Sequence, residues 1–126
     1  MPTARRQPAA APDPGAILTR AAVRAAERLG ISGRRLAEVL GVSEAQVSRL
    51  RSGEAALAER TKPFELAALL VRVFRSLDAI TGDEAVARAW LLAPNAALGA
   101  RPAERITSVQ GLADVVAYLD ARRAPL

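Results

Sequence analysis

The segment Leu-Ala-Glu-Val-Leu-Gly-Val-Ser-Glu-Ala-Gln-Val-Ser-Arg-Leu, residues 36–50, divides at a glycine into two short runs of helical pattern. Gly41 can adopt the left-handed backbone of a tight turn, and Ser43 with Gln46 has the spacing of a capping box that begins a helix. Two helices joined by three or four residues cross steeply, and the small side chain of Ala37 suits their contact. The side chains expected to hold the second helix on the core are Val42, Val47 and Leu50. The segment therefore predicts a helix-turn-helix.

A helix-turn-helix is typical of DNA-binding proteins, because the outward side chains of its second helix can reach base edges in the major groove. An ordinary helical hairpin is the alternative. The segment resembles the helix-turn-helix of Xre/Cro-type repressors, in which the second helix reads the bases. The base-facing residues that this resemblance implies are Glu44, Ala45, Gln46, Ser48 and Arg49. The phosphate contacts that it implies are Arg34, Arg35 and Arg51.

The chemistry of these side chains agrees with DNA reading and leaves local alternatives open. Arg49 could bind a guanine through two hydrogen bonds, and Gln46 could bind an adenine in the same way. Gln46 could instead be occupied in the capping box, and Glu44 could complement the positive end of its helix while repelling phosphates. The first helix opens with Gly33, where such repressors often have Gln or Thr to hold a phosphate.

The composition of the chain points to an all-α protein. Its 126 residues suit one or two small modules. Half of the residues, 51%, are hydrophobic but only 3% are aromatic, so the core must consist of Leu, Val, Ile and Ala. Sequence rich in Ala and Leu favours closely packed helices, and no run of alternating β-branched residues predicts a strand.

The absence of Cys and His from the sequence excludes several kinds of chemistry. Disulfides, thiolate or imidazole metal sites and His-dependent catalytic triads cannot form. The acidic residues are scattered, apart from Asp83 and Glu84 at an expected helix start, where acids complement the helix dipole. No Gly-rich phosphate loop follows a strand. We therefore expect no enzyme, no metal and no cofactor.

The net charge of +5 is unevenly distributed along the chain. Residues 1–60 carry ten Arg and six acids, a balance of +4, whereas residues 61–126 carry eight basic and seven acidic residues, a balance of +1. A basic N-terminal half beside a nearly neutral C-terminal half indicates two different tasks, although solvated Arg-rich faces are the alternative. No apolar run is long enough for a membrane span or a secretory signal, so a cytoplasmic protein is expected.

Capping and breaking residues divide the chain into three parts. Residues 1–12, with three Pro and two Arg, predict a disordered basic tail. Residues 13–60 form the predicted DNA-binding domain, in which Asp13-Pro14 begins a first helix that ends near Gly30. Residues 61–126 form the predicted C-terminal domain. The apolar residues on one face of the first helix are predicted to be Ile17, Ala21, Ala25 and Leu29.

The C-terminal domain is predicted to contain two long helices separated by a shorter one and a loop. Thr61 caps a long helix that runs to Ile80, and Asp83 caps the next helix, which ends near Leu92. Thr107 with Gln110 has the spacing of a capping box and is predicted to begin the last helix. The core side chains predicted for the long helix are Leu66, Leu70, Val73, Phe74, Leu77 and Ile80.

A second resemblance covers residues 15–124. The pattern consists of Leu69-Leu70, Val73-Phe74, Leu77, Gly82-Asp83, Ala87, Trp90-Leu91, Pro94-Asn95, Leu98-Gly99, Pro102, Gly111 and Val115. It resembles the Xre/MbcA/ParS-like antitoxins, and the run from Trp90 to Pro102 is similar to their toxin-binding domain. By itself, Trp90 could simply fill a small core.

The resemblance implies that the partner is a RES-domain toxin that consumes NAD, with this chain as its inhibitor and as the repressor of its own operon. In that family the end of the antitoxin lies at the mouth of the toxin's active site. The implied toxin-binding residues are Tyr118, Arg122, Arg123 and Leu126. A stand-alone repressor with a C-terminal dimerisation or ligand-sensing module is the alternative. Both readings predict a homodimer on operator DNA, because one reader helix supplies few base contacts, and the helix from Thr61 to Ile80 is the best predicted dimer surface.

Overall fold

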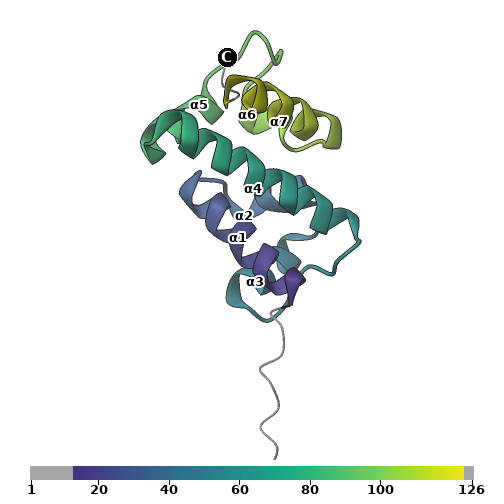
Figure 1. Cartoon of the computed structure of the whole chain (residues 1–126). Coiled ribbons are helices and arrows are strands. Elements are labelled where there is room, and N and C mark those ends of the chain that lie inside the picture. The colour runs from purple at the N-terminus through teal and green to yellow at the C-terminus, as the bar shows by residue number, and fades with distance from the viewer. Residues whose placement is uncertain (1–12, 124–126) are drawn as a thin grey trace, which may run out of the picture.

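The computed structural model describes residues 13–123, and their regular elements are seven helices (Figure 1). The helices are α1 (Pro14–Arg28), α2 (Gly33–Leu40), α3 (Glu44–Ser52), α4 (Lys62–Thr81), α5 (Glu84–Leu92), α6 (Pro102–Arg105) and α7 (Val109–Arg123). Within these residues the only strand-like pairing is one isolated bridge between Asn95 and Ala100. The predicted all-α fold is confirmed. The predicted tail, residues 1–12, lies outside the described residues.

The helix starts lie where the capping residues predict them. Asp13, Ser32 and Ser43 each accept a hydrogen bond from a backbone N–H in the first turn of α1, α2 and α3, at 3.0–3.1 Å. Gly41 ends α2 with a φ of +70°, the left-handed turn that leads into α3. The helix-turn-helix predicted from residues 36–50 is therefore present as α2 and α3.

The capping box predicted at Ser43 and Gln46 is wrong in part, and the one predicted at Thr107 and Gln110 is wrong. The Ser43 hydroxyl caps α3, but the Gln46 side chain bonds Arg49 instead of returning to the Ser43 N–H. Helix α7 begins at Val109, and Ser108 caps it by accepting from the Gly111 N–H at 3.0 Å. The Thr107 hydroxyl donates instead to the Glu104 carbonyl at the end of α6.

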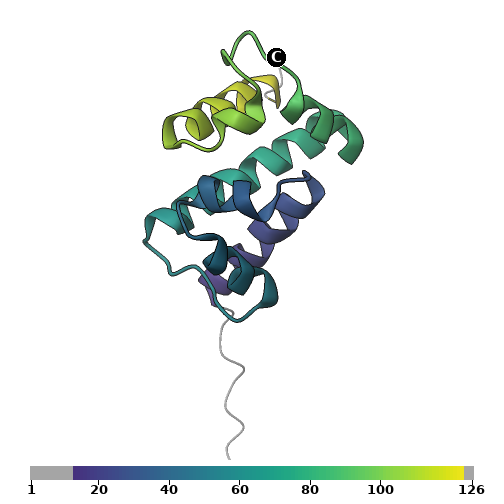
Figure 2. The same cartoon turned by 180° about the vertical axis from the view of Figure 1, so that it is seen from behind.

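Helix α4 lies between two groups of helices, with α1–α3 on one side and α5–α7 on the other (Figures 1 and 2). Its 20 residues span about 30 Å. Leu66, Leu70, Val73 and Leu77 are at most 5% exposed, as predicted. Ile80, predicted as core, is exposed, and so is Ile17 of α1. Ile80 lies in the last turn of α4, and α1 turns Ala22, Ala25 and Ala26 inward instead of Ile17.

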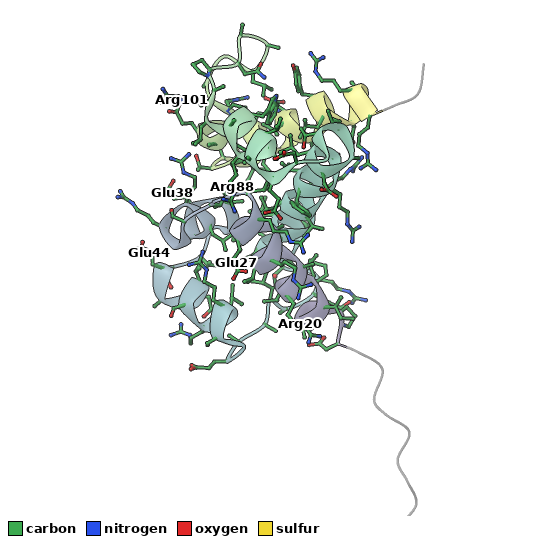
Figure 3. All side chains as sticks on the ribbon, turned by 90° about the vertical axis from the view of Figure 1, so that its left-hand side faces the viewer. Arg20, Glu27, Glu38, Glu44, Arg88 and Arg101 are labelled. Carbon is green, nitrogen blue, oxygen red and sulfur yellow. The ribbon has the colours of Figure 1, made fainter. Side chains whose placement is uncertain are left out.

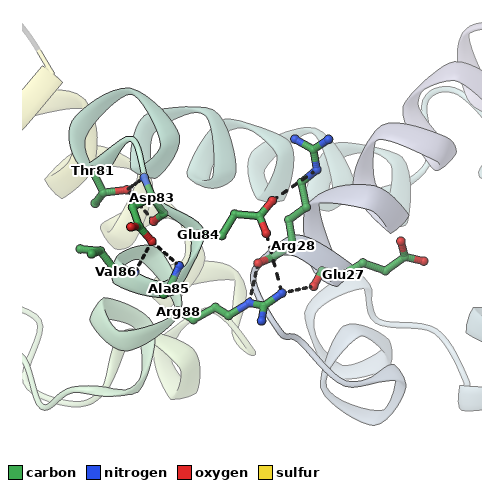
Figure 4. A network of polar contacts seen from close by, with 8 residues as sticks. All are labelled: Glu27, Arg28, Thr81, Asp83, Glu84, Ala85, Val86 and Arg88. Atoms are coloured by element: carbon green, nitrogen blue, oxygen red, sulfur yellow. Dashed lines mark hydrogen bonds and ion pairs between the residues drawn. The ribbon is translucent and has the colours of Figure 1, made fainter.

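An arginine of α5 joins the two groups of helices at the end of α1 (Figure 4). Arg88 donates from Nε to the carbonyl of Arg28 at 2.8 Å and from Nη2 to that of Glu27 at 3.3 Å. A cation at a helix C-terminus complements the helix dipole. The Glu84 carboxylate lies 3.7 Å from Arg28 Nε and 4.0 Å from Arg88 Nη2, so it binds both cations.

The segment between α3 and α4, which has no helical pattern, is fixed by the buried hydroxyl of Thr19. This hydroxyl donates to the Gly15 carbonyl at 2.6 Å and accepts from the Leu57 N–H at 2.9 Å. A Cβ on Gly15 would lie 2.2 Å from the Leu57 carbonyl oxygen, so only glycine permits this approach.

Among the helices of residues 13–123, none has both the length and the apolar character that a membrane crossing requires.

We expect Thr19→Val to lower the free energy of unfolding by about 1–3 kcal/mol, because it leaves the buried Leu57 N–H without an acceptor while preserving shape. Urea unfolding of both proteins measures the difference. Thr107→Val is the matched control: its hydroxyl makes one hydrogen bond at a more exposed site, so its effect should be clearly smaller. Equal losses in the two variants would contradict the role given to Thr19.

Candidate nucleic-acid interface and C-terminal surface

Helix α3 presents most of the predicted base-facing residues to solvent. Two buried side chains, Val47 and Leu50, fix the helix on the core. The exposed residues among the predicted readers are Glu44, Ala45, Ser48 and Arg49, whereas Gln46 is half-buried. Figure 3 shows Glu44 at the outer edge of the helix-turn-helix, away from α4. The predicted readers therefore share one accessible surface.

Gln46 and Arg49 form a pair on this surface. Gln46 Oε1 accepts from Arg49 Nη2 at 2.9 Å and from Nε at 3.2 Å. This arrangement holds the guanidinium over one turn of α3 and reduces the entropy that it would lose on binding a base. The Gln46 amide oxygen is occupied, so the two side chains would meet DNA as one unit.

The predicted phosphate contacts gather at the start of α2. Arg51 Nη2 donates to the Ile31 carbonyl at 3.4 Å, which brings its guanidinium beside Gly33. A Cβ on Gly33 would lie 3.0 Å from Arg51 Nη1. The glycine therefore leaves room beside the start of α2 for a cation that belongs to α3. Arg35 is half-buried nearby, and Arg34 forms an exposed ion pair with Glu38 at 3.9 Å.

Two of the four predicted residues at the C-terminal end of the chain lie together. The rings of Trp90 and Tyr118 stack with centroids 6.0 Å apart, and Arg122 lies over Tyr118 at 4.2 Å. We call these three side chains the aromatic column. Arg123 turns toward α4 instead, where its Nη1 donates to Ser76 Oγ at 3.3 Å. The fourth residue, Leu126, lies outside the described residues.

Trp90 was not among the predicted site residues. It is half-buried in this column and not enclosed in a core. It is the only Trp of the chain and Tyr118 is the only Tyr. The rarity of these two residues was a possible signal that both belong to a contact surface. Spacing along the sequence could not show it, because the two rings belong to α5 and α7.

An uncharged, exposed face of α5 lies next to Trp90 on the same helix. At 100° per residue, the exposed side chains of Val86, Ala89 and Leu92 fall within one sector of α5. Leu92 is 63% exposed and Val86 is 51% exposed. Residues 89–100 contain no charged side chain. Apolar groups left in water over such a stretch are typical of an interaction surface.

Two family models match consecutive parts of the chain. The antitoxin Xre-like helix-turn-helix domain matches residues 8–72. The antitoxin Xre/MbcA/ParS C-terminal toxin-binding domain matches residues 76–124. No curated protein matches the sequence significantly.

The stacking of Trp90 on Tyr118 can be tested by fluorescence, because Trp90 is the only tryptophan. We expect Tyr118→Ala to expose one face of the indole, shift its emission to the red and raise its acrylamide quenching constant. Tyr118→Phe keeps the ring and should leave both quantities close to those of the parent protein. Quenching that is the same in all three proteins would show that the rings are not stacked in solution.

Proposed function

The chain belongs to the Xre/MbcA/ParS-type antitoxins, and from this premise we propose that it neutralises a RES-domain toxin and represses its own operon. The observation that carries the proposal is the order of the two family matches, a helix-turn-helix domain followed by a toxin-binding domain. In this proposal residues 13–60 bind DNA and residues 61–126 bind the toxin. Helix α4 packs against both groups of helices and connects them. The chain would act by binding and not by catalysis.

For DNA binding, we infer that α3 enters the major groove and that the start of α2 meets a phosphate. Arg49, oriented by Gln46, would bind a guanine, while Ala45 and Ser48 are small enough to allow close approach. Arg51 beside Gly33 adds a cation to the N–H groups at the start of α2, where the helix dipole already favours an anion. A homodimer would place two such helices on adjacent half-sites.

For toxin binding, we infer that the aromatic column and the uncharged face of α5 form one contact surface. Binding energy at interfaces concentrates in Trp, Tyr and Arg side chains surrounded by apolar contacts, and this surface has all three. Arg122 would supply the charge that meets the acidic residues or the NAD-phosphate site of a RES toxin. Arg123, tied to Ser76, would contribute less unless that bond opens.

The reader helix lies apart from the proposed toxin surface, whereas the start of α2 adjoins α5, since Ser32 and Arg35 line one hollow with Leu91 and Leu92. Helix α3 and the group α5–α7 lie at opposite ends of the described molecule in both views (Figures 1 and 2). A toxin on the C-terminal group would not cover the reader helix. We therefore propose that the toxin-bound antitoxin remains a DNA-binding protein.

The alternative is a stand-alone dimeric repressor whose C-terminal module only dimerises or senses a ligand. Exposure of the uncharged α5 face is compatible with either reading, since a second copy could also cover it. Co-expression with the adjacent open reading frame distinguishes them. A RES-type neighbour that co-purifies with this chain supports the antitoxin, whereas a chain that dimerises and binds no neighbour supports the alternative.

We expect Arg49→Ala to weaken binding to the cognate operator by about 1–3 kcal/mol, because one bidentate base contact is lost. Binding to random DNA should change far less. Fluorescence anisotropy with both duplexes measures the difference, and Arg101→Ala, at an exposed arginine outside residues 13–60, is the control. Equal losses on operator and random DNA would make Arg49 a phosphate contact.

We expect Tyr118→Ala combined with Arg122→Glu to weaken toxin binding by at least about tenfold, because an aromatic anchor and its charge are removed together. Operator binding should persist. Arg34→Glu, on α2 of the helix-turn-helix, should show the reverse pattern. Substitutions are preferable to removal of residues 119–126, because that cut would take away Leu119, which is 1% exposed and part of the core. Full protection from the toxin by the double variant in a growth assay would refute this surface.

A further inference from the structure

A groove between α1 and α4 has an apolar floor and a basic rim. Its volume is about 420 Å³, its floor includes Ile17, Val71 and Phe74, and its rim consists of Arg20, Arg24 and Arg75. No carboxylate lines it. A second hollow of about 360 Å³ continues it along α1 as far as Pro14 and Ala68. From Pro14 to Ala25 the groove is about 16 Å long, which is three turns of helix.

The floor of the groove exposes apolar surface that the fold itself does not cover. Ile17 is 47% exposed, although the neighbouring turns of α1 bury Ala22, Ala25 and Ala26. Phe74 is half-buried, with the Arg28 guanidinium 5.8 Å from its ring centroid. Apolar surface in a groove that is long enough for three helical turns is the usual receptor for the apolar stripe of a helix.

The rim carries charge that is not neutralised within residues 13–123. Arg20, Arg24 and Arg75 form no ion pair with any described residue. The nearby Arg28 differs, since it pairs with Glu84 at 3.7 Å. Arg20 and Arg24 lie one turn apart on α1, and Arg75 lies on α4 across the floor. A ligand in the groove therefore meets positive charge on both flanks.

We propose that this groove binds an amphipathic helix of a partner protein whose apolar stripe is flanked by Asp or Glu. The apolar stripe fills the floor, and the acids on either side pair with Arg20 and Arg24 on one flank and with Arg75 on the other. A second copy of this chain fits less well, because a two-fold axis over the groove would bring the same arginines together. DNA would satisfy the arginines but offers no apolar stripe for Ile17, Val71 and Phe74.

The groove adjoins the DNA-binding surface but does not include the base-facing residues of α3, because Arg20 and Arg24 also line a hollow with Glu27 and with Arg51, Ser52 and Gly53 at the end of α3. Figure 3 shows Arg20 on the side of the molecule away from Glu44 of α3. The groove lies between α1 and α4, whereas the aromatic column is formed by α5 and α7. A helix in the groove would leave both the reader helix and the aromatic column accessible. The proposal therefore does not depend on the identity of the toxin or of the operator.

The test uses a fluorescein-labelled designed helix of about 14 residues, with a Leu stripe flanked by Glu, and the full-length chain. Anisotropy should show saturable binding that weakens as the salt concentration rises. Arg20→Glu with Arg24→Glu should weaken binding at least about tenfold, and Ile17→Glu should do so as well. Arg60→Glu, an exposed arginine away from the groove, is the matched control and should bind like the parent chain. Circular dichroism checks that each variant remains folded.

Three results would overturn the proposal. A version of the peptide with Lys in place of Glu that binds equally well would show that the rim does not select acids. Displacement of the peptide by random duplex DNA at matched charge would identify the groove as a phosphate-binding surface. A change from dimer to monomer in the Arg20→Glu, Arg24→Glu variant, measured by light scattering, would show that a second copy occupies the groove.

Discussion

The burial of α4 on two opposite sides is the constraint on which the rest of the structure depends. Residues of this helix contact α1 and α2 on one side and α5 and α7 on the other. Each of its fully buried Leu and Val side chains contributes about 1.5–3 kcal/mol of transfer free energy. Polar contacts set the register on the α7 side, where Arg72 pairs with Asp120 and Ser76 accepts from Arg123. The helices of the aromatic column therefore pack directly on α4, whereas the reader helix is connected to it through α1 and α2.

Local sequence determined much of this fold in advance. Asp13, Ser32, Ser43, Thr61 and Asp83 each cap a helix, and each could be recognised because a cap depends only on residues two or three positions away. The apolar stripe of α4 was also readable from its spacing. The errors arose where either of two neighbouring residues could cap the helix, as at α7, which Ser108 caps instead of its neighbour Thr107.

The contacts that shape the candidate sites could not be predicted in this way. Arg88 bonds carbonyl groups 60 and 61 positions away, and Trp90 stacks on a ring of α7. The spacing of these residues along the sequence does not indicate these contacts, because they depend on how α5 packs on the folded core. The same limit applies to Ile17: its place on the apolar face of α1 was readable from the pattern, but its exposure was not, because α4 covers only part of that face.

The contact between Gly33 and Arg51 links two positions that would otherwise evolve separately. A side chain at position 33 would shift the guanidinium, and loss of Arg51 would remove the cation that lies beside Gly33. The two sites should therefore change together during divergence. For protein engineering, a recognition helix transplanted from a relative would need to bring its own residue at position 33, because position 33 at the start of α2 adjoins position 51 near the end of α3 in the folded protein.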